Sequence, residues 1–175
     1  MISVVPLNSV GVNWVGIIVG LVAIERLAEL FYANRNTRKL LARGGQEIGR
    51  NHYPLIVALH TAWLAAVYLA APPDVAPIWW LIAVYLVLQA MRYWIIASLA
   101  GYWTTRIITV PDAPLVKRGP YRFLRHPNYA VVIAEIAILP LAFREPLVAL
   151  VFSVLNAVLL WRRIRIENGA LNARV

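Results

Sequence analysis

The sequence predicts an all-α integral membrane protein with five transmembrane helices, its N-terminus outside and its C-terminus inside the cell. The composition, the lengths of the apolar stretches and the placement of basic residues lead to this prediction. Of the 175 residues, 61% are hydrophobic and only 14% are charged. Soluble domains are about 45–50% apolar and about 25% charged. We therefore expect one membrane-embedded domain, residues 1–175.

Five apolar stretches supply the predicted spans. Residues 10–32, 53–71 and 77–97 reach or approach the ~20 residues that a helix needs to cross the hydrocarbon core. Residues 127–142 and 146–161 are shorter, and at 1.5 Å per residue each would form about 24 Å of helix. Only residues 143–145 separate them, so they are expected to form a tight helical hairpin.

The basic residues orient the chain. Most of the 17 Lys and Arg lie between the first and second stretches, between the third and fourth, or after the fifth. The positive-inside rule places these three segments in the cytoplasm. The first is expected to be helical as far as Gly44 and Gly45. Residues 101–126 mix aliphatic, aromatic and basic side chains with prolines. We expect this segment at the cytoplasmic interface, before the fourth helix and partly tucked against the bundle.

Charge and composition also exclude several partners. A net charge of +9 could indicate nucleic-acid binding. Here the basic residues flank membrane spans, so no nucleic-acid partner is predicted. The chain has no Cys, and its three His are far apart in the sequence, so no metal site is predicted.

Several ionisable or polar residues fall inside the predicted spans, all in the cytoplasmic half. They are Glu25, Arg26, Glu29, Gln89, Arg92 and Glu135. Such residues are costly in a bilayer and indicate function by default. Either the arginines simply neutralise the glutamates, or the group forms a polar pocket open to the cytosol; the one-sided placement favours the pocket. His60, near the middle of the second span, is expected to be neutral and bonded to a backbone carbonyl.

The residues before the fourth span form the richest polar cluster. Gly119-Pro120 predicts a turn, and Pro127 suits the first position of a helix. Arg125, His126, Asn128 and Tyr129 then crowd the start of that helix, where free N–H groups and the positive helix end favour an anionic group such as a carboxylate. After the fifth stretch, Arg163 and Glu167 are one helical turn apart and can face the same pocket.

Together these residues resemble the isoprenylcysteine carboxyl methyltransferase family of integral membrane enzymes. The family pattern Leu-Val-x-x-Gly-x-Tyr, followed by Arg-His-Pro-x-Tyr, is matched over residues 115–129. Its later Arg-x-x-x-Glu is matched by Arg163 and Glu167. The resemblance covers residues 101–175. Membrane phospholipid methyltransferases and sterol-type reductases share a looser version of the pattern.

The resemblance implies methyl transfer from S-adenosyl-L-methionine to a carboxyl or hydroxyl oxygen of a lipophilic acceptor. The reaction would take place at the cytoplasmic face of a bacterial plasma membrane, among membrane lipids. Arg163 would orient the acceptor, and Glu135 is our candidate base for a hydroxyl acceptor. The expected cofactor-binding residues are Ala113, Pro114, Leu115, Val116, Tyr121, His126, Pro127, Asn128, Tyr129 and Glu167.

Two alternatives stay open at this stage. A membrane reductase could use NADPH on a lipid substrate, with Arg118, Arg122 and Arg125 meeting the phosphates. A non-enzymatic membrane scaffold would use residues 125–129 only as an interfacial anchor. It would bind no cofactor.

Overall fold

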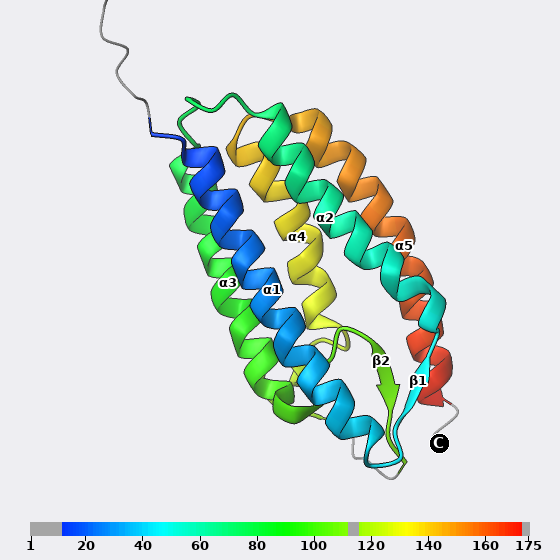
Figure 1. The fold of residues 1–175 in the computed structure, drawn as a ribbon. Helices are drawn as coiled ribbons and strands as arrows, with labels where there is room; N and C mark the ends of the chain where they lie inside the picture. Colours follow the sequence, from blue (N-terminus) through cyan, green and yellow to red (C-terminus); the bar gives the residue numbers. More distant parts are fainter. Residues whose placement is uncertain (1–11, 112–115, 173–175) are drawn as a thin grey trace, which may run out of the picture.

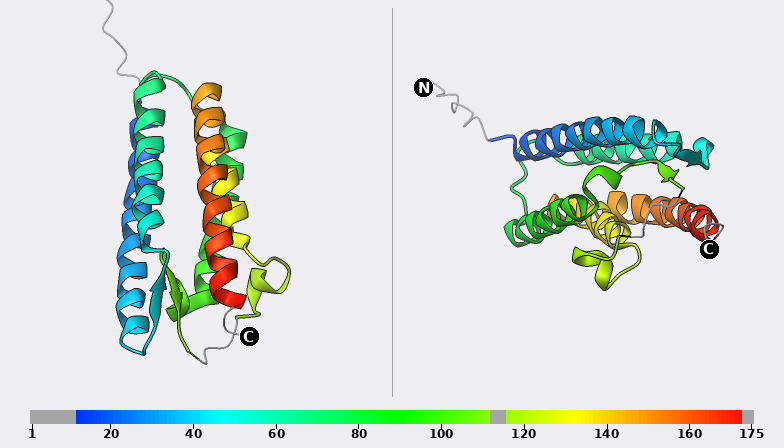
Figure 2. Two further views of the ribbon diagram at one scale, coloured as in Figure 1. Left: turned by 90° about the vertical axis from the view of Figure 1, so that its right-hand side faces the viewer. Right: turned by 90° about the horizontal axis from the view of Figure 1, so that it is seen from below.

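Five helices in two layers make up most of the protein. The structure is a computed structural model that describes residues 12–111 and 116–172. Its helices are α1 (Trp14–Leu41), α2 (Tyr53–Ala70), α3 (Trp79–Leu99), α4 (Pro127–Ala142) and α5 (Pro146–Asn172) (Figure 1). Seen along the bundle, α1 and α2 form one layer, and α3, α4 and α5 form the other (Figure 2). The five predicted helices are therefore confirmed.

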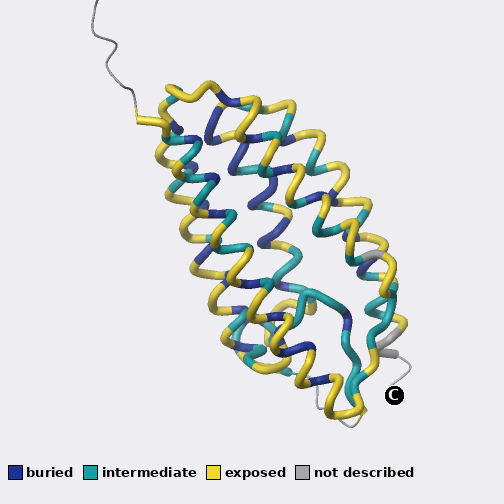
Figure 3. Tube along the Cα trace, in the orientation of Figure 1, coloured by how far each residue is buried: buried dark blue, intermediate teal, exposed yellow. Residues whose placement is uncertain are grey.

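The outer surface of the bundle is strongly apolar. Large side chains such as Leu69, 79% exposed, and Leu147, 70% exposed, point outward, and exposed positions run along the helices (Figure 3). Soluble monomers rarely expose contiguous apolar surface of this kind, so it suits contact with lipid. Among the described residues, α2, α3 and α5 are long and apolar enough to cross a membrane, and α4 is a shorter apolar helix. The full count of five spans stays a prediction.

The main core lies between the two layers. Trp63 of α2 is 1% exposed, and its indole Nε1 donates to the carbonyl of Ile136 in α4, at 3.2 Å. This bond fixes α2 against α4. Around it pack the buried side chains Val15, Val19, Val22, Val67, Tyr85, Val132, Leu139 and Phe143.

Helix α1 extends beyond its apolar stretch. It begins after Asn13, whose side chain accepts from the Gly16 N–H at 2.8 Å, as N-capping residues do. Its basic last third remains helical, as expected, and Asn36 there donates to the carbonyls of Ala100 and Trp103, at 3.2 and 2.9 Å. Gly44, with φ +82°, follows the helix end in a conformation that favours glycine.

A short pair of strands departs from the all-α prediction. Strands β1 (Gln46–Ile48) and β2 (Ile107–Thr109) pair antiparallel, with Glu47 opposite Ile108. Three-residue strands are too short for a periodic signal in the sequence. The Glu47 carboxylate accepts from Arg106 at 2.9 and 3.2 Å across this pair. The pairing holds the segment after α3 against the segment after α1.

The other described residues of this segment, within 101–111 and 116–126, lie at the same end of the bundle. Trp103 and Ile107 are buried, as expected for a segment tucked against the helices, whereas Phe123 is 80% exposed. A 3₁₀ turn, Gly119–Arg122, packs next to the end of α3, where Arg118 Nε donates to the Ser98 carbonyl at 2.6 Å. Within this segment, Trp103, Ile107 and Arg118 therefore contact the bundle, whereas the apolar side chain of Phe123 is exposed.

Helix α5 is longer than the predicted span of residues 146–161. It continues to Asn172: no proline follows the apolar stretch, and the helix runs on through Gly169. Arg163 and Glu167 thus lie on one rigid helix and not on a tail that follows it.

Gly119 is expected to be needed for this packing. Its φ is +57°, and a Cβ atom built there would overlap Ser98 Oγ. Gly119→Ala should therefore destabilise the protein by about 1–3 kcal/mol. Gly101→Ala is the control, because a Cβ at Gly101 meets nothing within 4 Å. Thermal unfolding in detergent should show a lower Tm for Gly119→Ala, and equal values for the two variants would contradict this packing.

Candidate functional site

Two cavities share a wall at the end of the bundle where β1 and β2 lie. The larger, about 350 Å³, lies between the helix layers and is lined from all five helices. The smaller, about 200 Å³, lies among the start of α4, the end of α5 and residues 99–109. The shared wall consists of Trp103, Thr104, Asn128, Tyr129 and Arg163. A group bound in one cavity can therefore reach a group bound in the other.

The smaller cavity gathers half of the ten residues expected to bind a cofactor. Its lining includes Tyr121, His126, Asn128, Tyr129 and Glu167. They come from the turn before α4, from the first turn of α4 and from the end of α5. The fold thus brings together residues that are up to 46 positions apart in the sequence.

The remaining expected cofactor residues are placed differently. Pro127 is buried at the first position of α4 and lines neither cavity. Val116 is partly buried and also lines neither. Ala113, Pro114 and Leu115 lie outside the described residues.

A chain of hydrogen bonds connects the site residues. The Tyr129 hydroxyl donates to the Glu167 carboxylate and accepts from Arg163 Nε at 2.8 Å. Arg163 Nη2 also donates to the carbonyl of Thr105, at 2.8 Å. The His126 ring stacks on Tyr129 with centroids 5.1 Å apart, and its Nδ1 lies 3.7 Å from Glu167. These contacts hold α4, α5 and the segment after α3 in one arrangement.

Two residues that line the smaller cavity each have a buried polar atom without a hydrogen-bond partner in the described chain. His126 Nε2 and Asn128 Oδ1 are buried and have no hydrogen-bond partner among the described residues. Buried polar groups are normally paired, because an unpaired one costs about 1–3 kcal/mol. Burial, together with the negative charge of Glu167, raises the pKa of the Tyr121 phenol, which therefore stays protonated. The cavity thus suits a ligand that carries both donors and acceptors.

Arg163 differs from the other buried arginines. It is 8% exposed, and within residues 12–111 and 116–172 no carboxylate lies within ion-pair distance of it. Its partners are the neutral oxygens of Tyr129 and Thr105, and no described group bonds to Nη1. Buried charges are usually paired. Because Arg163 lies in the shared wall, the unpaired charge favours an anionic group at that wall.

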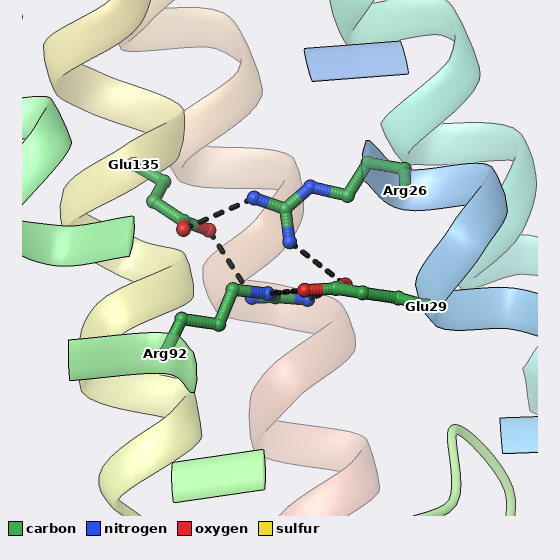
Figure 4. Close-up of polar contacts among 4 residues, drawn as sticks. All are labelled: Arg26, Glu29, Arg92 and Glu135. Carbon is green, nitrogen blue, oxygen red and sulfur yellow. Dashed lines mark hydrogen bonds and ion pairs between the residues drawn. The ribbon is translucent and has the colours of Figure 1, made fainter. Parts of the chain in front are cut away.

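Arg26 and Arg92, by contrast, are each paired with two carboxylates (Figure 4). Arg26 donates to Glu29 and to Glu135, both at 3.0 Å. Arg92 donates to both oxygens of Glu29 and, at 3.2 Å, to Glu135. This four-residue ion-pair ring has no net charge and joins α1 to α3 and α4. The arginines thus neutralise Glu29 and Glu135, whereas Glu25 forms no ion pair with the described residues. Arg26, Glu29 and Arg92 also line the larger cavity.

Glu135 is not brought next to Arg163. It lies six residues beyond Tyr129 on α4, about 9 Å along the helix. Its two oxygens accept from two different arginines, and its side chain lines neither cavity. Its catalytic role stays a prediction, and its contacts in this structure are those of a ring member.

Sequence reasoning missed two residues that shape the site. Thr105 holds Arg163 through its main-chain carbonyl, a contact that no side-chain pattern announces. Asn156 of α5 is 3% exposed and lines the larger cavity. A polar residue deep in an apolar run was the signal that could have identified Asn156.

Comparisons with known proteins place the chain among membrane enzymes. The model of the isoprenylcysteine carboxyl methyltransferase (ICMT) family matches residues 80–173. A Bacillus subtilis protein named "Uncharacterized protein YpbQ" is 41% identical over 161 residues, 89% of this chain and 95% of the relative. A Haemophilus influenzae protein named "Uncharacterized protein" is 25% identical over 154 residues, 84% of this chain and 88% of the relative. No solved structure matches the chain.

Breaking the ion-pair ring should destabilise the protein strongly. Arg92→Met leaves Glu29 and Glu135 short of positive charge in a buried setting, which costs about 3–5 kcal/mol. Arg50→Met is the matched control, because Arg50 is 75% exposed and its pair with Glu47 should contribute less than about 1 kcal/mol. Thermal unfolding in detergent measures both. A Tm for Arg92→Met as high as that of the control would show that the ring is not structural.

Proposed function

We propose that this chain, which belongs to the isoprenylcysteine carboxyl methyltransferase family, transfers a methyl group from S-adenosylmethionine to an oxygen of a lipophilic acceptor. One observation carries the proposal. Arg163, a buried cation without a carboxylate partner, lies in the wall common to a polar cavity and a larger, mostly apolar one. The family implies a membrane methyltransferase. The donor, the acceptor class and the residue roles are our proposal.

The residues of the smaller cavity fit S-adenosylmethionine. Its amino-acid part carries an ammonium and a carboxylate, and its nucleoside carries several donors and acceptors. Glu167 offers a carboxylate to the ammonium, and the open atoms His126 Nε2 and Asn128 Oδ1 offer further partners. The start of α4 has no side-chain cap, so its positive end is free to favour a carboxylate. Leu115 and Val116 would border the adenine, and Ala113 and Pro114 complete the proposed set.

The larger cavity fits the acceptor. When bound, the cofactor supplies an electrophilic methyl group on a positively charged sulfur. In-line transfer needs an acceptor oxygen about 3–3.5 Å from that carbon. Arg163 would hold the oxygen through Nη1, while Tyr129 and Thr105 fix the guanidinium from the other side. Leu30, Val132 and Leu160 contribute to the mostly apolar lining of the larger cavity, which disfavours water there. Low water content favours a reaction that brings opposite charges together.

The unpaired guanidinium favours an acceptor that arrives ionised. A carboxylate meets this condition, and so does an acidic hydroxyl. A less acidic hydroxyl would also have to lose its proton during the reaction, the step for which Glu135 is our candidate base. Both Glu135 oxygens already accept hydrogen bonds from arginines. We therefore favour an acceptor that is ionised before the reaction.

We also propose that all five helices cross the membrane and that the site faces the cytoplasm. The ends of α1, α3 and α5 and the starts of α2 and α4 lie at the same end of the bundle as the strands (Figure 1). The basic residues of the loops gather at this end, which the positive-inside rule assigns to the cytoplasm. Residues 1–175 would then form a single domain whose last 75 residues bind most of the cofactor.

Cofactor binding tests the first half of the proposal. Purified protein in detergent should bind S-adenosylhomocysteine in isothermal titration calorimetry. Glu167→Gln removes the negative charge that would meet the ammonium, and His126→Ala removes the imidazole. Each should weaken binding about tenfold or more, because a hydrogen bond to a charged group is worth about 1.5–3 kcal/mol. Arg122→Ala is the control, because Arg122 is exposed and lines neither cavity. Binding of NADPH in place of S-adenosylhomocysteine would favour the reductase. Absence of binding, with His126→Ala tolerated, would favour the scaffold.

The role of Arg163 is tested by separating turnover from cofactor binding. Arg163→Lys keeps a positive charge but loses the planar fork that contacts Tyr129 and Thr105. We expect methylation of an acidic lipid, followed with labelled S-adenosylmethionine, to fall about 10- to 100-fold. S-adenosylhomocysteine affinity should change much less. Loss of cofactor affinity with unchanged acceptor KM would contradict the assignment.

A further inference from the structure

The larger cavity contains polar groups far from the wall where methyl transfer is proposed. His60 of α2 and Asn156 of α5 both line it. Neither is part of the ion-pair ring, and neither contacts the smaller cavity. An acceptor whose body is a plain hydrocarbon would offer neither His60 nor Asn156 a hydrogen-bond partner.

His60 and Asn156 lie farther from β1 and β2 than the residues that contact Thr105. The Thr105 hydroxyl donates to the Tyr53 hydroxyl at 3.3 Å, and the Thr105 carbonyl accepts from Arg163 at 2.8 Å. Arg163 belongs to the shared wall, and Tyr53 lines the larger cavity. His60 lies seven residues, or two turns, beyond Tyr53 on α2, and Asn156 lies seven residues before Arg163 on α5, in both cases away from β1 and β2. The main chain at each residue is thus about 10 Å farther along its helix than at Tyr53 or Arg163.

The protonation of His60 is set by its main-chain contact. Its Nδ1 lies 2.9 Å from the Ile56 carbonyl, as the sequence predicted, and a carbonyl can only accept. Nδ1 therefore carries the proton. No carboxylate of the described chain lies within ion-pair distance of His60, so the ring is neutral. Nε2 then offers a lone pair, for which the described residues provide no donor.

Asn156 is a matching group on the opposite layer. It is 3% exposed, and no hydrogen bond to its amide is formed within the described part of the chain. An amide both donates and accepts. A hydroxyl between the two could donate to His60 Nε2 and accept from the Asn156 NH₂. His60 itself is too far from Arg163 to act as the base of methyl transfer.

We propose that the acceptor carries a hydroxyl about 10 Å from the oxygen that is methylated, and that His60 and Asn156 recognise it. This inference rests on the proposed function and narrows its substrate class. The acceptor would be an elongated lipophile with an acidic oxygen at one end and a second polar group within its body. A simple fatty acid or an unsubstituted prenyl chain would lack that second group.

A pair of defined acceptors tests the proposal. Stearic acid and a stearic acid hydroxylated at mid-chain are each incubated with the purified protein and labelled S-adenosylmethionine. We expect kcat/KM for the hydroxylated acid to be at least about tenfold higher, the factor that one to two hydrogen bonds supply. The hydroxylated acid should also raise the Tm of the S-adenosylhomocysteine complex more than stearic acid does.

Variants locate the source of this preference. Asn156→Leu and His60→Phe should each reduce kcat/KM for the hydroxylated acid more than for stearic acid. Phe keeps a ring beside Trp63, whose centroid lies 6.4 Å from that of His60. Ser153→Ala is the control, because Ser153 lies one turn from Asn156 on α5 and lines neither cavity. It should keep the preference.

The outcomes separate this inference from the proposed function. Equal kcat/KM for the two acids would contradict the proposed recognition of a hydroxyl by His60 and Asn156, but not the proposed methyl transfer. A preference for the hydroxylated acid that both variants retain would contradict this recognition in the same way. Binding of S-adenosylhomocysteine with no methylation of, and no stabilisation by, either acid would overturn the acceptor class inferred here. Failure to bind S-adenosylhomocysteine would contradict the proposed function and with it this inference.

Discussion

The ion-pair ring of Arg26, Glu29, Arg92 and Glu135 is the constraint on which the rest of the structure depends. It joins α1, in one layer, to α3 and α4, in the other, and its members are largely buried. Removing four charges from water is costly, and the cost is repaid only when every charge has a well-placed partner. The ring therefore allows one relative placement of the two layers. The larger cavity lies between layers held in this way.

The ring and Arg163 make different contributions to the charge of the site. Two guanidinium and two carboxylate groups cancel, so the deep part of the larger cavity carries no net charge from them. Arg163, at the shared wall, keeps a positive charge that neutral oxygens solvate but do not neutralise. An anionic group entering the bundle is therefore drawn to the wall and not to the ring. This contrast is the physical basis for placing the reaction at the junction of the two cavities.

Contacts at the end of the bundle near β1 and β2 convert the helix bundle into a site. Strands β1 and β2 fix the segment after α3, and Thr105 in that segment then positions Arg163 through its carbonyl. The Tyr129 hydroxyl bonds to both Arg163 and Glu167. The two α5 residues of the family pattern therefore hold α4 through the same side chain. Each contact joins elements that are distant in the sequence. The smaller cavity therefore forms only when the whole chain is folded.

The sequence by itself determined the helices and six of the residues that line the smaller cavity, namely Tyr121, His126, Asn128, Tyr129, Arg163 and Glu167. Apolar length and prolines are local signals, so α4 was predicted with its observed bounds, and the motif around His126 and Tyr129 was recognisable as it stands. Only the tertiary structure decided which charges pair, because Arg92 meets Glu29 across 63 positions. It also decided that Glu135 belongs to the ring, that Thr105 acts through its main chain, and that His60 and Asn156 line one cavity. Such pairings depend on how helices pack in three dimensions, and no local pattern encodes that.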